Sequence, residues 1–569
     1  MIKSLTTVCA LLLSVTGFAS EVTIYTAKSL ITMDLSHPRA TAVAVQNGLI
    51  VGVGNEASLT PWIERAGGTV DRRLENSFVM PGFIDPHVHP SLPAILTQLP
   101  FLAPDDWSLP TGEFPGALTP EDYKKKLIAL ESKHTDKSKP FGAWGYHELW
   151  HGQVRRAELD AWFGDRPVFI WQRSFHEVIF NTAALHYFGI TQADAKAAHG
   201  EANWSEGHFW ENGLFAVFRN LGYLIEPQNY MRGTLNFLEM AHQGGVTTAV
   251  DMGLGISSDP DTELKLLEGL VKKTQAPLRL VMTPTASKFI QAGTTPEQAL
   301  EQVRQWQHTY IGQVSVRDHF KLMVDGAIFS ALAQFNAPGY LDGHQGVWLT
   351  PQATLNEYAN IFWRAGFQLH AHSNGDAATQ RTLDLVETLL AEAPRQDHRF
   401  AIEHFAYATS DQAKRIKALG VIVSANPYYH YILSDSYGAY EIGPSRAEQM
   451  VRLGTLERLG VPFTLHSDTP MAPLAPLTLA WNATNRQTIN GNLTGQNERA
   501  SLDAALKAIT IDAAWAVGME TEIGSIAVGK KADFTVLAQD PYEVGASGLR
   551  DIEILGTVFE GRFAPINKD

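Results

Sequence analysis

Eight short apolar, strand-like runs recur through the centre of the chain and alternate with stretches of helical periodicity. This alternation is typical of βα units arranged around a parallel sheet. The runs cover residues 78–86, 245–252, 278–283, 319–324, 367–372, 399–404, 421–424 and 463–467. Because a closed barrel of this kind needs eight parallel strands, we predict an α/β fold built on a (β/α)8 TIM barrel.

The two ends of the chain follow a different pattern, with short alternating strands and turn residues between them. These strands are expected at residues 22–25, 42–45, 48–54, 524–537 and 552–561. We therefore expect both termini to build one small β-sandwich domain. The predicted division assigns residues 20–78 and 521–569 to this domain and residues 79–520 to the barrel. A chain of 569 residues has room for both.

One interval within the predicted barrel is far longer than a single crossover connection. Some 140 residues separate His89 from the helical stretch near residues 231–243. The interval is rich in tryptophan. We predict that an inserted subdomain, at about residues 92–230, covers the barrel mouth.

The first nineteen residues have the features of a signal peptide. Lys3 precedes an apolar run at residues 5–15, and a small-x-small site ends at Ala19. The apolar run is shorter than the roughly 20 residues that span a membrane, so we expect no membrane span. The mature protein is then exported, either periplasmic or secreted. The one cysteine, Cys9, lies in this segment, which leaves the mature chain without a thiol ligand or nucleophile.

The charge of the chain limits the kind of partner that it can have. The formal net charge is −15, and no basic cluster stands out beyond residues 124–126. A nucleic acid, whose phosphates require a basic surface, is therefore not an expected partner. We expect a small-molecule substrate. The sequence leaves the oligomeric state open, a homodimer included.

Polar residues with metal-binding or proton-transfer chemistry lie at or near the ends of the predicted strands. They are His87, His89, Lys321, His372, His404 and Asp468. His87 and His89 stand two residues apart, so on a strand their side chains share one face and can bind the same ion. Imidazoles and carboxylates are the ligands of zinc and similar divalent ions. Barrel enzymes carry their chemistry at the C-terminal ends of the strands, which makes this a candidate active site.

Seven segments together resemble the amidohydrolase superfamily and, within it, the YtcJ-like branch that includes N-substituted formamide deformylase. They are residues 80–89, 175–185, 321–326, 372–376, 402–404, 467–468 and 524–534. The resemblance covers roughly residues 22–563. It implies a (β/α)8 barrel with a small β-sandwich from both termini. It also implies hydrolysis of a C–N amide-type bond in an N-acyl or N-formyl small molecule by a metal-activated hydroxide.

The resemblance also implies a role for each polar residue. His87 and His89 would bind one divalent metal ion, for which zinc is expected, and His372 and His404 would bind a second. Lys321 would bridge the two ions as a carbamate, because an unmodified ammonium has only donors. Asp468 would bind the first ion, act as general base on the water, and pass the proton to the leaving group.

Three further residues are predicted to contact the substrate. His176 matches a family position that faces the substrate pocket. After the seventh strand, residues 424–431 depart from the Gln-Pro motif of many relatives, and here Asn426 and Tyr428 are expected to reshape the pocket. The formamide substrate of the relative is therefore not assumed to be the substrate of this chain.

Two other functions are compatible with the sequence. The same site can hydrolyse an ester or a lactone, since the chemistry depends little on the leaving group. The barrel can also belong to a catalytically silent binding or regulatory protein. The presence of every expected ligand argues against that third hypothesis, because a binding module does not need a base beside a metal site.

Overall fold

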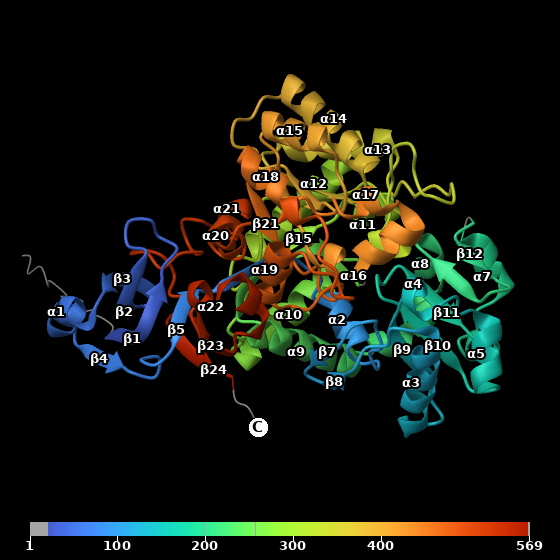
Figure 1. The fold of residues 1–569 in the computed structure, drawn as a ribbon, viewed down its shortest axis with the longest axis horizontal. Coiled ribbons are helices and arrows are strands. Elements are labelled where there is room, and N and C mark those ends of the chain that lie inside the picture. Colours follow the sequence, from blue (N-terminus) through green and yellow to red (C-terminus); the bar gives the residue numbers. More distant parts are fainter. Residues whose placement is uncertain (1–20, 199, 257, 567–569) are drawn as a thin grey trace, which may run out of the picture.

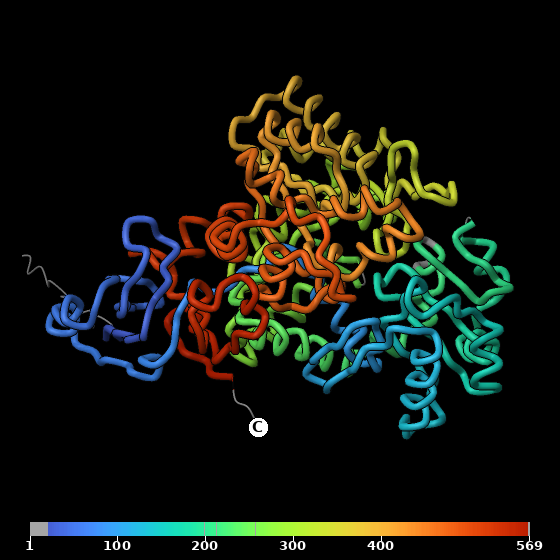
Figure 2. The backbone as a smooth tube through the Cα atoms, in the orientation of Figure 1, coloured from blue at the N-terminus to red at the C-terminus, as the bar shows by residue number. Residues whose placement is uncertain are grey.

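The computed structural model describes residues 21–198, 200–256 and 258–566 (Figure 1). The predicted signal peptide lies outside these residues. A small sheet lies at one end of the molecule, an α/β centre follows, and an inserted region lies at the other end (Figures 1 and 2). Within the described ranges, no helix combines the length and the apolar character needed to cross a membrane.

The small sheet contains strands from both ends of the chain. Its strands are β1 (Val22–Ile31), β2 (Arg39–Gln46), β3 (Leu49–Gly54), β4 (Gly68–Asp71), β5 (Phe78–Pro81), β22 (Phe534–Leu537), β23 (Ile554–Phe559) and β24 (Arg562–Pro565). Their order is β24-β23-β22-β5-β1-β2-β3, with β4 paired to β1. The antiparallel pair of β5 and β22 joins the N-terminal strands to the C-terminal ones.

The first predicted strand, residues 78–86, is two strands in the structure. β5 belongs to the small sheet, whereas β6 (Phe83–Val88) belongs to the centre. Gly82 stands between them, and a Cβ at this position would lie 2.0 Å from Oγ1 of Thr247. The chain can pass from one sheet to the other here because glycine has no side chain to clash with β14 (Val246–Leu254).

The centre consists of parallel strands in two groups. The strands after β6 and β14 are β15 (Arg279–Pro284), β16 (Val314–Val316), β17 (His319–Met323), β18 (Gln368–Ser373), β19 (Ala401–His404), β20 (Ile422–Ala425) and β21 (Phe463–Leu465). One group has the order β16-β15-β14-β6 and the other β17-β18-β19-β20-β21. Parallel bridges join Thr285 to Lys321 and Val88 to Thr469, so the groups meet at both edges. The result is an α/β fold of the TIM-barrel type.

Amphipathic helices connect the central strands. The longer ones are α9 (Pro227–Gln243), α10 (Pro260–Thr274), α12 (Pro296–Thr309), α13 (Gln352–Arg364), α14 (Asp376–Glu392), α15 (Ser410–Leu419) and α19 (Pro476–Asn485). The start of α12 shows why the sequence forms a helix here. Thr295 and Gln298 form a capping box ahead of one buried face, which carries Ala299, Val303 and Trp306.

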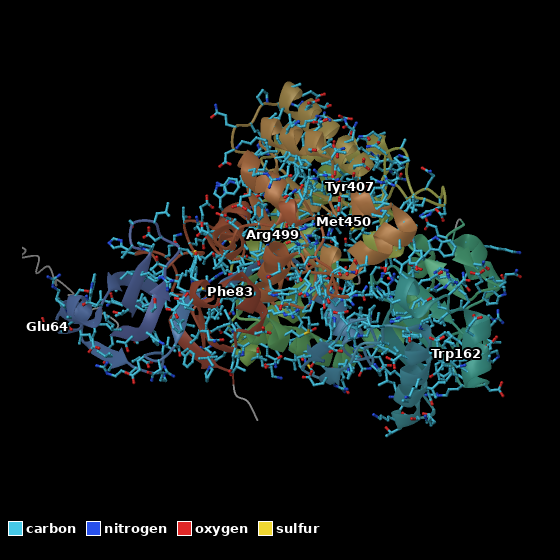
Figure 3. All side chains as sticks on the ribbon, viewed as in Figure 1. Glu64, Phe83, Trp162, Tyr407, Met450 and Arg499 are labelled. Carbon is cyan, nitrogen blue, oxygen red and sulfur yellow. The ribbon has the colours of Figure 1, made fainter. Side chains whose placement is uncertain are left out.

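The inserted region has a sheet of its own, ordered β12-β13-β11-β10-β9. Its strands are β9 (Phe141–Tyr146), β10 (Val168–Gln172), β11 (Glu177–Phe180), β12 (Ala202–Asn203) and β13 (His208–Trp210). A hairpin of β7 (Trp107–Leu109) and β8 (Gly112–Phe114) and helices α3 (Pro120–Lys133), α5 (Arg156–Phe163) and α8 (Asn212–Phe218) accompany it. Figure 3 labels Trp162 in this region, and Glu64 at the opposite end of the molecule.

Candidate active site

A cavity of about 220 Å³ lies where the central strands end. All six residues predicted at the strand ends line it: His87, His89, Lys321, His372, His404 and Asp468. His176, from the inserted region, lines it as well. Because the strands are parallel, their C-terminal ends meet at one rim, and residues hundreds of positions apart are brought together there.

His87, His89 and Asp468 form one group that could hold a metal ion, since their ligand atoms lie within 4.8 Å of one another. Oδ1 of Asp468 is 3.0 Å from Nε2 of His89 and 3.5 Å from Nε2 of His87. The backbone N–H of Asp468 donates to the carbonyl of His87 at 3.0 Å. This bond ties the loop after β21 to β6 and sets the carboxylate beside both imidazoles.

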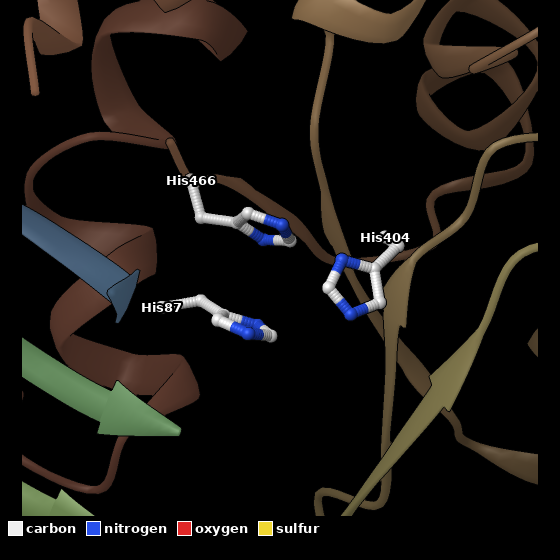
Figure 4. A group of neighbouring side chains, drawn as sticks. All are labelled: His87, His404 and His466. Atoms are coloured by element: carbon white, nitrogen blue, oxygen red, sulfur yellow. The ribbon is translucent and has the colours of Figure 1, made fainter. Parts of the chain in front are cut away.

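A second group of the same kind contains His87, His404 and His466 (Figure 4). The ring centre of His87 lies 4.5 Å from that of His466 and 4.7 Å from that of His404. Nε2 of His404 and Nε2 of His466 are both buried, and neither has a hydrogen-bond partner. An unpaired polar atom is costly in a protein interior. With their ring protons on Nδ1, these two Nε2 atoms would offer lone pairs to a cation, and the residues fit a metal centre.

His372 and Lys321 complete the cluster but differ in how they are placed. The ring of His372 lies 4.2 Å from that of His404, and its Nε2 is 3.0 Å from the side-chain amide of Asn374. Nζ of Lys321 lies 3.4 Å from Nε2 of His87. His372 thus lies beside His404, as predicted, and His466, which the sequence did not single out as a ligand, adds a further imidazole 5.4 Å from the ring of His404.

The ammonium of Lys321 is fully enclosed by the protein. Burial lowers the pKa of Lys321 to about 8, against the opposing effect of the carboxylates of Glu403, Asp468 and Asp251. A group with this pKa is partly a neutral amine near neutral pH. The buried amine of Lys321 therefore loses its proton more readily than an exposed lysine does.

Glu403 is a buried carboxylate that organises the histidines, and the sequence did not identify it. Its Oε2 lies 2.7 Å from Nδ1 of His87, and its Oε1 lies 2.7 Å from Nδ1 of His370. A carboxylate can only accept, so Nδ1 of His87 carries the proton and Nε2 presents its lone pair to the cavity. Burial alone would raise the pKa of Glu403, but the bond from His370 and the charge of Lys321 lower it to about 2.

Asp251, on β14, is a second carboxylate that the sequence did not identify. Its Oδ1 lies 3.6 Å from Nδ1 of His89, and burial raises its pKa. The one signal that could have found Asp251 and Glu403 is a charged residue inside an otherwise apolar strand. Such a residue needs a buried partner, but the sequence does not say which one.

The inserted region adds a His–Glu pair to the cavity. Nδ1 of His176 lies 2.8 Å from Oε2 of Glu211, and the side chain of His176 is 27% exposed. Burial would lower the pKa of His176, but the carboxylate of Glu211 outweighs it, and the pKa is raised. His176 thus faces the cavity, as expected. Glu211, its partner, also lines the cavity.

The structure places Asn426 and Tyr428 away from the cavity, contrary to the sequence-based expectation. Neither is among the described residues that line it. The amide of Asn426 donates to the carbonyl of Ser467 at 3.0 Å, and the hydroxyl of Tyr428 donates to Asp105. The hydroxyl of Tyr429 lies instead 3.1 Å from Nδ1 of His404 and lines the cavity.

The reason lies in the local backbone. Tyr428 begins helix α16 (Tyr428–Ser436), where neighbouring side chains point about 100° apart. The sequence identified the segment that contains both tyrosines, but it did not show that Tyr429, and not Tyr428, points into the cavity.

The rest of the cavity wall is largely apolar. It includes Phe175, Met252, Ile256, Ile290, Phe329 and Met471. Among the described lining residues, Lys321 is the only lysine or arginine. An apolar pocket with a few convergent polar groups is typical of a small-molecule site.

Comparison with known proteins gives three findings. Residues 72–565 match the model of the amidohydrolase family. N-substituted formamide deformylase of Arthrobacter pascens is 25% identical, with 93% of this chain and 96% of the relative covered. The putative amidohydrolase YtcJ of Bacillus subtilis (strain 168) is 24% identical, with coverage of 92% and 96%.

A similar fold is found among solved structures. An uncharacterized metal-dependent hydrolase from Pyrococcus horikoshii OT3 superposes with a TM-score of 0.70 at 20% identity. The superposition covers 93% of this chain and 100% of that one. At this identity the likeness concerns the fold alone.

Proposed function

The chain belongs to the amidohydrolase family, and we propose that it hydrolyses the C–N bond of a small N-acyl or N-formyl compound with the help of a divalent metal. The prediction of an amidohydrolase that acts on non-peptide carbon–nitrogen bonds is confirmed by the family match. The observation that carries the specific proposal is the cavity itself. Six residues predicted at or near five different strand ends line it together, and two groups that could hold a metal ion share His87, one of these six.

The proposal extends to the architecture and the location of the protein. The central strands form a closed (β/α)8 barrel, residues 20–78 and 521–569 form the β-sandwich, and residues 92–230 form a subdomain over the barrel mouth. The parallel bridges at both edges of the two central groups support closure. Cleavage after Ala19 and export remain part of the same proposal.

His87, His89 and Asp468 would hold one divalent ion, for which zinc is the expected identity. His404 would hold a second ion together with His372 or His466, and the unpaired Nε2 atoms of His404 and His466 support this. A bound ion supplies Lewis-acid chemistry: it makes water more acidic and polarises a carbonyl group. Glu403 holds the Nδ1 proton of His87, which keeps Nε2 free for the ion.

Lys321 would bridge two ions as a carbamate. The neutral amine attacks the carbon of CO2 and loses one proton, which leaves a carbamate with one negative charge. The lowered pKa of about 8 supports this step, because only the neutral amine reacts. The carbamate oxygens can accept and ligate, which an ammonium cannot do.

Asp468 would take the proton from the water that attacks the carbonyl carbon. Its Oδ1 lies near His87 and His89, and its Oδ2 lies 3.5 Å from both the hydroxyl of Tyr429 and Nδ1 of His404. The carboxylate is therefore held within the cluster from two sides. The apolar wall would exclude bulk water and would favour an uncharged, apolar substituent on the substrate.

Turnover of matched substrates tests this proposal. The chain purified without chelator is assayed on an amide and an ester that share the same acyl group, and its metal content is measured. We expect amide hydrolysis that a chelator abolishes and a divalent ion restores. Preference for the ester would favour ester or lactone hydrolysis at the same site. A metal-free protein without turnover would favour the silent binding protein.

Mass spectrometry tests whether Lys321 is carbamylated. Digestion under conditions that preserve carbamates should yield the Lys321 peptide with the added mass of one CO2. A Lys321→Met variant should show neither the added mass nor full metal content. Bare lysine in a protein that holds two metal ions would contradict the bridge.

A further inference from the structure

The inserted region contributes a side-chain pair to the cavity that the proposed reaction does not yet use. We propose that His176 is the general acid that protonates the leaving nitrogen, and that Glu211 positions it. The inference rests on the proposed function. It divides the two proton transfers of amide hydrolysis between Asp468 and a residue on another wall of the cavity.

One hydrogen bond orients the His176 ring, and two more fix the backbone of His176. Nδ1 faces Oε2 of Glu211 at 2.8 Å, and the backbone N–H of Glu211 donates to the carbonyl of His176 at 2.9 Å. The backbone N–H of His176 donates to Oγ of Ser174 at 3.1 Å. Since Nδ1 faces a carboxylate, it carries a proton. Nε2 is the remaining ring nitrogen and is the atom available to a substrate.

The chain adopts uncommon backbone conformations to place this pair. Phe175, which precedes His176, has φ +69°, and Glu211 has φ +45°. Residues with a Cβ rarely adopt this left-handed region, and they are enriched at functional sites when they do. Glu211 is also nearly fully buried, whereas the His176 side chain keeps 27% of its surface exposed. The carboxylate is enclosed behind the imidazole, and the imidazole faces the cavity.

The charges around His176 favour the protonated ring that an acid requires. Burial opposes the charge, but the carboxylates of Glu211, Asp468 and Glu177 together raise its pKa above the usual value. A histidine that is protonated before the reaction can donate from Nε2 while Nδ1 stays on Glu211. Glu211 thereby holds the charge as well as the orientation of the ring.

Asp468 is less well placed to serve both proton transfers. Oδ1 lies 3.0 Å from Nε2 of His89, and Oδ2 lies 3.5 Å from Nδ1 of His404. Both oxygens therefore face the histidine cluster, where water would be activated. A donor on a different wall can reach the nitrogen that departs, while Asp468 keeps the proton it has taken.

The step balances as a simple hydrolysis. Asp468 takes one proton from water as the water oxygen bonds to the carbonyl carbon. The C–N bond then breaks, the nitrogen keeps the electron pair, and His176 gives that nitrogen the proton from Nε2. The products are an acid and an amine. Asp468 releases its proton to solvent and His176 regains one.

The alternative role for His176 is a hydrogen bond to the carbonyl oxygen of the substrate. The two roles differ in their response to the leaving group. A carbonyl contact acts the same way whichever amine departs. A general acid matters more as the departing amine becomes more basic, because a basic amine cannot leave without a proton.

The test uses the N-acetyl derivatives of 4-nitroaniline, aniline and cyclohexylamine, whose amines rise in basicity in that order. His176→Gln should lower kcat little for the nitroanilide and about 100-fold or more for the cyclohexylamide. Glu211→Gln should shift the same series in the same direction by a smaller factor. A loss of equal size across the series would overturn the inference.

A matched control lies outside this cavity. His344 and Asp342 form another pair of a histidine and a carboxylate, with Nδ1 of His344 2.6 Å from Oδ1 of Asp342, and His344 does not line this cavity among the described residues. His344→Gln should leave the leaving-group dependence of kcat unchanged. Thermal unfolding and metal content of all variants should match the wild-type chain, which excludes misfolding as the cause.

Turnover by the wild-type enzyme distinguishes a failure of the His176 role from a failure of the proposed function. Metal-dependent turnover with a flat loss in His176→Gln would overturn the role of His176 alone. Absence of turnover on every amide would overturn the proposed function and this inference with it.

Discussion

The cavity has two walls of different construction. The barrel wall is made of strand ends, and its polar residues are numerous and mostly buried, with Glu403 bonded behind them to His87 and His370. The wall from the inserted region has one His–Glu pair, which loops and short hydrogen-bonded connections hold in place. Parallel strands bring ligands together through the topology of the whole fold, whereas the inserted wall depends on a few local contacts. The first construction suits a metal centre, and the second suits adaptation to a substrate.

A buried cation connects the two walls. Arg173, three residues before His176, forms an ion pair with Asp105 and donates to the hydroxyl of Tyr428 at 3.1 Å. It also donates to the carbonyl of Met471 at 3.3 Å, three residues after Asp468. Arg173 thus joins the inserted region to both helix α16 and the loop after β21.

The largest expected effect comes from the barrel wall. Asp468→Asn should lower kcat by about 10³-fold or more while the metal content persists, because an amide cannot accept the proton. Steady-state kinetics and metal analysis check this. Asp251→Asn is the comparison, since Asp251 contacts His89 but does not line the cavity in the described chain, and its effect should be smaller. Full activity of Asp468→Asn would remove Asp468 as the base.

The next effect concerns how the barrel wall holds its metal. Glu403→Gln should weaken metal affinity by about 10- to 100-fold, because glutamine keeps only one acceptor oxygen for the two N–H donors of His87 and His370. Competition with a chromogenic chelator measures this directly. Glu498→Gln, a change at a buried carboxylate that bonds to Thr455, should leave the affinity unchanged. Equal affinities of Glu403→Gln and the wild-type chain would contradict the role of Glu403.

The connection between the walls should have a smaller effect on activity. Arg173→Met should destabilise the fold by about 3–5 kcal/mol, because Asp105 is left as a buried, unpaired charge. It should also lower kcat/KM by about tenfold through displacement of the His176 wall.

The control for Arg173 is Arg279→Met. Arg279 forms a buried ion pair with Asp533 at 2.8 Å, between the barrel and the small sheet. It should cost similar stability in a denaturant titration but leave kcat/KM unchanged in the protein that remains folded. Equal kinetic effects of the two variants would show that Arg173 acts through stability alone.

The smallest effect separates two neighbouring tyrosines. Tyr429→Phe removes a hydroxyl that lies 3.1 Å from Nδ1 of His404, and it should lower kcat by about fivefold, the value of one hydrogen bond. Tyr428→Phe should instead lower the melting temperature, because its hydroxyl bonds to Asp105 and Arg173. The reverse pattern would restore Tyr428 as the substrate contact.

The central strands and the polar residues at or near their ends could be predicted from local sequence. Each of the eight apolar runs contains a central strand, since a buried parallel strand needs an unbroken apolar segment. His87, His89, Lys321, His372, His404 and Asp468 could be named because each lies at or near the end of such a run. The order of parallel strands then places them at one rim.

The partners of these residues could not be predicted in the same way. Glu403 faces His87 across 316 positions of sequence, and Tyr429 rather than Tyr428 faces His404. His466 joins His87 and His404 in a group that the sequence did not indicate. Periodicity tells which residues share a strand face, but it does not give the distance between two faces or the rotation of a helix about its axis. Those are decided by packing, because burial forces each polar atom to find its partner among whatever the rest of the chain brings near.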